Sequence, residues 1–201
     1  MRDFEEVRAA VLAKGYKFFE NDLSINMIWE RTSDVFTNQF TDHLNILYFQ
    51  NKKPMQLVLP ATTKPGLKGS ILEPITVENV TGTAIIIPNQ YRGSHQFLDT
   101  YTEFSKYPYF RQRGVLDYWR DGDKDLELDR VQRQEDRVFH THVHRMSNNG
   151  TYGSRQVNNF SLGCMGAPEP EFKRLLEPTR ECVKKYGDMF TQTILETIDF
   201  K

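Results

Sequence analysis

One stretch of the chain brings together residue types that can perform acyl transfer. Residues 139–166 read FHTHVHRMSNNGTYGSRQVNNFSLGCMG, with alternate histidines at the start and a glycine–cysteine pair near the end. A thiol that attacks a carbonyl needs a base to take its proton and N–H donors for the oxyanion that forms. His144 is a candidate base for Cys164, and Gly163 would let backbone amides approach a substrate carbonyl. On residue types alone, Cys164 as a small buried apolar side chain remains an open alternative.

The histidines also allow metal chemistry. A strand predicted over Val138–His144 would place His140, His142 and His144 on one face, because side chains alternate along a strand. Three such imidazoles can hold zinc, with Cys164 or Glu135 as a fourth ligand. A zinc-dependent hydrolase is therefore one alternative function.

One acidic segment matches part of the residue pattern of a calcium-binding loop. Asp121, Asp123 and Asp125 alternate and Asp129 follows them. The sixth position, which requires glycine, is Leu126, and the twelfth, which requires a bidentate glutamate, is Gln132. The segment is therefore better explained as an acidic turn between strands.

The remaining chain predicts a mainly β protein with a helix near each end. Asp3 and Glu6 form a capping-box pattern at the start of a helix over residues 3–14, and Pro170 suits the first turn of a helix over 169–187. A further helix is predicted near Ser94–Phe104. Strands are predicted for short segments rich in β-branched and aromatic residues, namely Ile25–Arg31, Leu44–Phe49, Met55–Leu59, Thr83–Ile87, Val115–Trp119, Val138–His144 and Phe190–Ile198. We expect an N-terminal helical segment at 1–20 and a single domain over 21–201.

Composition excludes several classes of protein. The 201 residues carry 26 basic and 27 acidic side chains, which argues against an electrostatic nucleic-acid binder. No apolar run is long enough to span a bilayer, and the first twenty residues lack the apolar stretch of a secretory signal. Two cysteines, Cys164 and Cys182, are too few for a disulfide framework, and Cys182 falls on the apolar stripe of its predicted helix. Composition does not indicate an oligomeric state.

The order of these motifs resembles the catalytic domain of L,D-transpeptidases. In that family a histidine is followed, after a spacer of limited length, by Ser/Thr-His-Gly-Cys. Here residues 145–160 separate His144 from Ser161, whereas a spacer counted from His142 is too long. Two upstream segments, Pro60–Gly66 and Gly82–Ile85, resemble the family's Thr-Pro-x-Gly segment and the strand after it. Pro88–Gly93, Trp119–Asp121 and His144–Cys164 also follow the order found in uncharacterised proteins of gut bacteria and their phages.

The resemblance implies an L,D-transpeptidase-like β-sandwich acting on peptidoglycan stem peptides without a cofactor. It implies that Cys164 is the nucleophile, that His144 is the base and that the Gly163 and Cys164 amides bind the oxyanion. A thioester would form, and either a stem-peptide amine or water would resolve it. Further residues expected to contact substrate are Ser161, Arg145, Tyr91, Arg92, His142 and Arg155.

The chain also departs from the family pattern. The family's histidine before Gly-Cys is Leu162, and Met165-Gly166 replaces an aliphatic residue followed by Arg or Asn. Arg145 or Arg155 would then have to supply the missing charge. The lack of a visible signal favours a phage lysin made in the host cytoplasm or carried on the virion, with a periplasmic enzyme whose signal was removed as the other possibility. A non-catalytic wall-binding or virion structural protein remains a further alternative.

Overall fold

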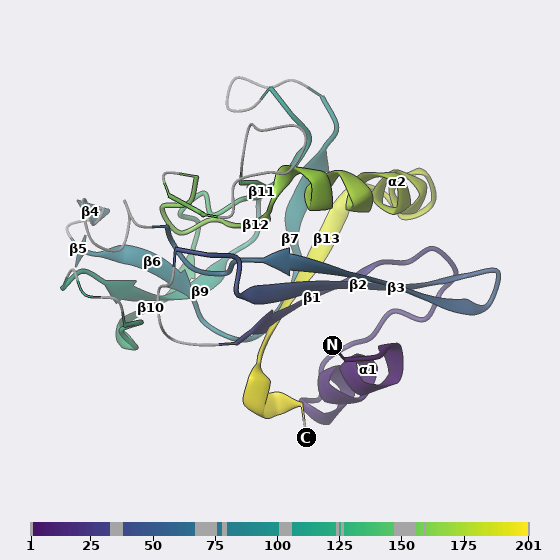
Figure 1. Ribbon diagram of the computed structural model, residues 1–201, viewed down its shortest axis with the longest axis horizontal. Helices are drawn as coiled ribbons and strands as arrows, with labels where there is room; N and C mark the ends of the chain where they lie inside the picture. The colour runs from purple at the N-terminus through teal and green to yellow at the C-terminus, as the bar shows by residue number, and fades with distance from the viewer. Residues whose placement is uncertain are drawn as a thin grey trace.

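The computed structural model describes residues 2–32, 38–66, 76–77, 80–100, 106–123, 125, 127–146, 156–158 and 160–200 (Figure 1). Two helices and thirteen strands are assigned within these residues, together with a short 3-10 helix, Thr197–Asp199. In chain order they are α1 (Phe4–Ala13), β1 (Asn26–Arg31), β2 (Asp42–Gln50), β3 (Lys53–Ala61), β4 (Thr76–Val77), β5 (Val80–Thr81), β6 (Thr83–Ile86), β7 (Gln90–Leu98), β8 (Tyr109–Gln112), β9 (Leu116–Asp121), β10 (Val131–Arg137), β11 (Val143–Arg145), β12 (Met165–Ala167), α2 (Glu169–Tyr186) and β13 (Met189–Glu196).

The main sheet curls into a nearly closed barrel. Its eight strands lie in the order β12-β11-β8-β7-β13-β1-β2-β3. The pairs β1–β13 and β11–β12 are parallel, and the other neighbours are antiparallel. Thr62, just after β3, forms an antiparallel bridge with Gly166 in β12, so the two ends of the sheet meet. They meet beside residues 160–164, which we name the cysteine loop. A smaller sheet, β10-β9-β6, and the β4–β5 pair lie beside it.

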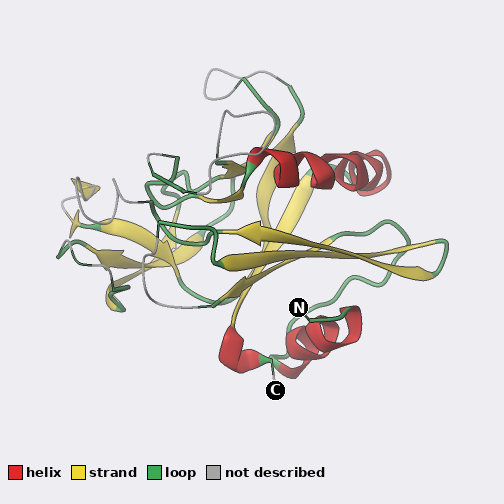
Figure 2. Ribbon diagram, in the orientation of Figure 1, coloured by secondary structure: helices red, strands yellow, loops and turns green. Residues whose placement is uncertain are grey.

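The two helices cover opposite sides of the main sheet (Figure 2). The side chain of Asp3 accepts the Glu6 amide and the side chain of Glu6 accepts the Asp3 amide, which caps α1. The apolar stripe of α1 packs with Ile28, Leu47 and Leu195, which project from the outer face of the sheet. On the other side, α2 buries Phe172, Leu175 and Cys182 in the main core. Burial of both stripes fixes the barrel that carries the cysteine loop.

Most of the predicted elements are confirmed. The N-terminal helix and its capping box, the helix after Cys164, and strands at every predicted segment but one are present. The mainly β fold with a helix near each end is therefore confirmed. The burial of Cys182 on its helix is also confirmed. No helix among the described residues is long and apolar enough to cross a membrane.

Two predicted elements are wrong. Residues 94–98 belong to β7, which pairs with β8 and β13, so the helix expected from Ser94 is absent there, and residues 101–105 lie outside the described part. The strand predicted over Val138–His144 is shorter: β10 ends at Arg137 and β11 begins at Val143. His140 between them has a φ of 58°, a left-handed conformation that interrupts an extended strand.

Candidate functional site

Cys164 lies at the point where its loop enters β12. In the parallel β11–β12 pair, Val143 is level with Met165 and His144 with Gly166. Cys164, one residue before the first paired residue of β12, therefore lies beside His142. The backbone N–H of His142 donates to Sγ of Cys164 at 3.3 Å. The thiol lies 3.8 Å from the His140 carbonyl oxygen, to which its S–H can donate. Continuing the alternation of β12 one residue back to Cys164 assigns its side chain to the same face as that of His144; the recorded contacts of Sγ are with the backbone of His142 and His140.

Glycine is required at both positions flanking the Cys164–Met165 pair. Gly163 has a φ of 129°, and a Cβ there would lie 2.8 Å from the carbonyl oxygen of Ala84. A Cβ on Gly166 would lie 2.0 Å from the carbonyl oxygen of His144. Gly163 thus lets the cysteine loop press against β6, and Gly166 lets β12 approach β11 closely.

The two predicted oxyanion donors are not equivalent. The Gly163 N–H donates to the side-chain oxygen of Ser161 at 3.2 Å. The same Ser161 hydroxyl donates to the Cys164 carbonyl at 2.7 Å, so Ser161 organises the loop from inside. Within the described part of the chain, no acceptor is recorded for the Cys164 N–H. The Cys164 amide is therefore the available donor, and Ser161 is a buried loop residue.

The two histidines nearest the thiol differ in tautomer. Nδ1 of His144 lies 2.7 Å from the Arg145 carbonyl oxygen, which can only accept, so this nitrogen carries the proton. Nε2 of neutral His144 therefore keeps its lone pair. Nδ1 of His142 instead accepts the Gln112 backbone N–H at 3.2 Å, so the proton of the neutral ring is on Nε2. Of these two rings, that of His144 is the one whose basic nitrogen has no recorded partner among the described residues.

Burial keeps both rings neutral near pH 7. It lowers the pKa of His142 to about 3, with the neighbouring histidines adding to the effect, and it also lowers the pKa of His144. Behind them, His95 is fully buried with a pKa lowered to about 4, and its Nε2 donates to the Thr141 carbonyl at 2.9 Å. Sequence reasoning missed His95 and Gln112, because a buried polar residue inside a strand gives no distinctive pattern.

The thiol is protonated at neutral pH. Burial raises the pKa of Cys164 to about 11, although the His142 N–H partly opposes this by stabilising the thiolate. Among the residues that the structure describes, no histidine ring hydrogen-bonds to Sγ, so His144 is not joined directly to the thiol. The arrangement is that of a resting thiol with a basic nitrogen on the same face.

The other predicted contact residues are placed as follows. Arg145 pairs with the buried carboxylate of Glu169 at 2.8 Å and lies over the ring of Tyr107, so its charge is matched within the protein. Tyr91 lies inside β7, is buried, and donates its hydroxyl proton to the Ile87 carbonyl at 2.7 Å, which makes it a core residue. Arg92, next to it, is exposed. Arg155 lies outside the described residues.

The described residues contain no preformed site for the zinc ion that the histidines would bind. His140 is exposed and precedes β11, so the three histidines do not continue along one strand face, and that expectation is wrong. Glu135 is exposed on β10 and pairs with Arg133. Over the described ranges, no group of three His, Cys, Asp or Glu side chains is arranged to hold a metal ion.

The acidic segment caps its own turns. Carboxylate oxygens of Asp121, Asp123 and Asp125 accept the backbone N–H groups of Asp129, Asp125 and Glu127 respectively. Burial, with the neighbouring carboxylates, raises the pKa of Asp121 to about 6. These contacts are those of an acidic turn following β9.

Comparisons with protein-family models, with curated proteins and with solved structures found no match to this chain.

Proposed function

We propose that the chain is an L,D-transpeptidase-like cysteine enzyme that acts on peptidoglycan stem peptides through a thioester. The proposal for the chemistry rests on the geometry around Cys164, and the proposal for the substrate and for a sandwich of the transpeptidase type rests on the motif resemblance. The single observation that carries it is the hydrogen bond from His144 Nδ1 to the Arg145 carbonyl. This bond directs the lone pair of His144 to Nε2, on the strand face shared with the thiol.

The proposed reaction proceeds in two halves. Nε2 of His144 takes the thiol proton as Sγ of Cys164 bonds to the peptide carbonyl carbon, and the oxyanion that forms accepts the Cys164 N–H. The C–N bond then breaks, the amine leaves with the proton held by His144, and a thioester remains. A second amine gives a transferred peptide, and water gives a free carboxylic acid; either nucleophile passes its proton to His144 and releases the thiol.

Substrate binding must complete this site. His144 is level with Gly166, one step of about 7 Å along the strand from the level of Cys164. Gly166 has no side chain, and the space that one would take is occupied by the His144 carbonyl and the side chain of Met146. Catalytic hydrogen bonds commonly tighten only when substrate is bound, and displacement of water would favour the proton transfer.

A non-catalytic wall-binding protein is the second candidate. Two observations favour it: the pKa of Cys164 is raised, and no side chain among the described residues is recorded as a partner of the thiol. Digestion of purified peptidoglycan, with the products identified by mass, separates the two. The enzyme produces new stem-peptide products that Cys164→Ala abolishes and Cys182→Ala leaves intact. Binding without new products, by the parent and by Cys164→Ala alike, contradicts the proposed catalysis.

A further inference from the structure

A short segment after β3 holds the cysteine loop from both sides; we name residues 62–66 the clamp segment. Thr62 exchanges two backbone hydrogen bonds with Gly166, at 2.8 and 3.0 Å. At its other end, the Gly66 N–H donates to the Ser161 carbonyl at 2.8 Å. Between them, the Lys64 carbonyl lies 3.3 Å from the Ser161 hydroxyl. The clamp segment thus bonds to the chain on each side of Cys164.

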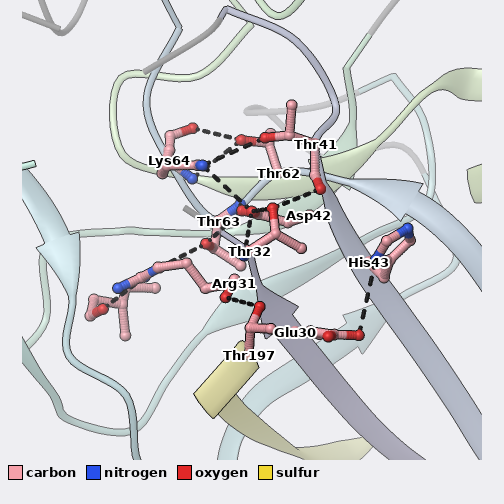
Figure 3. A network of polar contacts seen from close by, with 11 residues as sticks. Glu30, Arg31, Thr32, Thr41, Asp42, His43, Thr62, Thr63, Lys64 and Thr197 are labelled. Carbon is pink, nitrogen blue, oxygen red and sulfur yellow. Dashed lines mark hydrogen bonds and ion pairs between the residues drawn. The ribbon is translucent and has the colours of Figure 1, made fainter. Parts of the chain in front are cut away.

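The clamp segment is in turn fixed by one buried carboxylate. Asp42, at the start of β2, is completely buried (Figure 3). Its Oδ2 accepts the Thr63 backbone N–H at 2.9 Å and the Thr63 hydroxyl at 2.7 Å. Its Oδ1 accepts the Thr32 N–H at 3.1 Å and pairs with the ammonium group of Lys64 at 3.3 Å. Both side chains of that ion pair are almost inaccessible to solvent.

Two neighbours keep this carboxylate in place. The Thr63 hydroxyl also accepts the Nε–H of Arg31 at 2.9 Å, so its proton is directed to Asp42. The Lys64 ammonium group reaches the hydroxyl of Thr41 at 3.4 Å. Since the recorded partners of the Asp42 carboxylate are donors, replacing one carboxylate oxygen by an amide NH₂ sets donor against donor.

We propose that Asp42 is a positioning residue for Cys164: by holding Thr63 and Lys64, it fixes the clamp segment and through it the cysteine loop. The effect on catalysis rests on the proposed function, whereas the effect on the loop does not. Asp42 contacts neither the thiol nor the histidines; it acts on them through the backbone bonds at Thr62 and Gly66. Loss of the charge at position 42 releases the cysteine loop from the clamp segment, whereas Cys164 and His144 themselves are unchanged.

Amide hydrogen exchange tests this directly. In Asp42→Asn, the amides of Gly66 and Gly166 exchange at least tenfold faster than in the parent at the same pH. Thr63→Val, a milder change that removes the hydroxyl, gives the same local effect, and Thr63→Ser restores slow exchange. Unchanged protection of both glycine amides in folded Asp42→Asn and Thr63→Val overturns the proposal.

A matched control separates positioning from general destabilisation. Glu30 is also a buried carboxylate, which pairs with Arg2 and lies 3.8 Å from Nδ1 of His43. It belongs to β1 and has no recorded contact with the clamp segment among the described residues (Figure 3). Glu30→Gln should leave the two glycine amides protected. On wall fragments, Asp42→Asn should lower kcat about tenfold with KM within twofold, while Glu30→Gln changes neither. If exchange responds as stated but the parent has no wall activity, the positioning holds and the proposed function fails.

Discussion

The reactivity of Cys164 in the free protein should rise steadily with pH and reach no plateau near neutrality. Burial favours the uncharged thiol and raises its pKa from an ordinary 9.0 to about 11. A thiol paired with a histidine as a thiolate–imidazolium ion pair would behave in the opposite way, with a depressed pKa and a plateau below pH 7. The structure therefore predicts that this site is not pre-ionised.

The magnitude follows from two opposing effects. A pKa raised by about two units lowers the thiolate population at pH 8 about 100-fold. A more basic thiolate is intrinsically more nucleophilic, with a Brønsted slope of about 0.4–0.5, which recovers about eightfold. Alkylation of Cys164 at pH 8 should therefore be about tenfold slower than alkylation of the same thiol in the denatured chain.

Iodoacetamide labelling between pH 6.5 and 10.5, with the peptides that carry Cys164 and Cys182 quantified by mass, measures this profile. The same labelling in denaturant supplies the reference for each thiol, and Cys182, buried in α2, reports any unfolding. His144→Ala should leave the profile of the free protein nearly unchanged, because no hydrogen bond joins that ring to Sγ among the described contacts. A plateau below pH 7.5 that His144→Ala removes would refute the resting-thiol account.

Three other perturbations have expected outcomes. Gly163→Ala should lower the free energy of unfolding by about 2 kcal/mol or more and slow turnover, because of the positive φ and the close carbonyl; denaturant titration with a kinetic assay checks this. Asp121→Asn should stabilise the protein at pH 8 but not at pH 3.5. The pKa of Asp121 is about 6 in the folded protein, above the unfolded value of 3.8, so its contribution to stability is full below pH 3.8 and is lost as the pH rises through 6. Unfolding curves at both pH values measure this difference. His144→Ala should reduce turnover of wall fragments by about 10² or more, His142→Ala by less and His140→Ala least. Equal losses in all three histidine variants, with loss of a bound metal, would contradict the cysteine mechanism.

Much of the architecture was predictable because local patterns determined it. The Asp3–Glu6 capping box, the β-branched and aromatic residues of β1 and β2 and the apolar stripe around Cys182 each specify an element from its own residues. The segment at Ser94 was misjudged because its polar residues are buried: His95 and Ser94 hydrogen-bond to each other inside β7, and polarity at those positions did not indicate a strand.

The site was predictable only at the level of which residues take part. The motif spacing singled out Cys164 and His144, which the structure places at the neighbouring strands β11 and β12. The left-handed conformation of His140, which shortens the predicted strand before β11, gave no signal in the sequence. The pairing of Arg145 with Glu169 is a contact between a strand and a helix that no local pattern reveals. The resemblance at Pro60–Gly66 indicated the segment beside the cysteine, whereas the role of Asp42 depends on a long-range contact.

Trapping the thioester tests the central claim most directly. The protein is incubated with purified stem peptides, quenched in acid and measured by intact mass, and the modified peptide is then identified. The account predicts an acyl adduct on Cys164 that hydroxylamine removes and that Cys164→Ala does not form, while Cys182→Ala forms it normally. Turnover of the stem peptide by Cys164→Ala at the parent's rate, with no adduct on either thiol of the parent, would contradict the account.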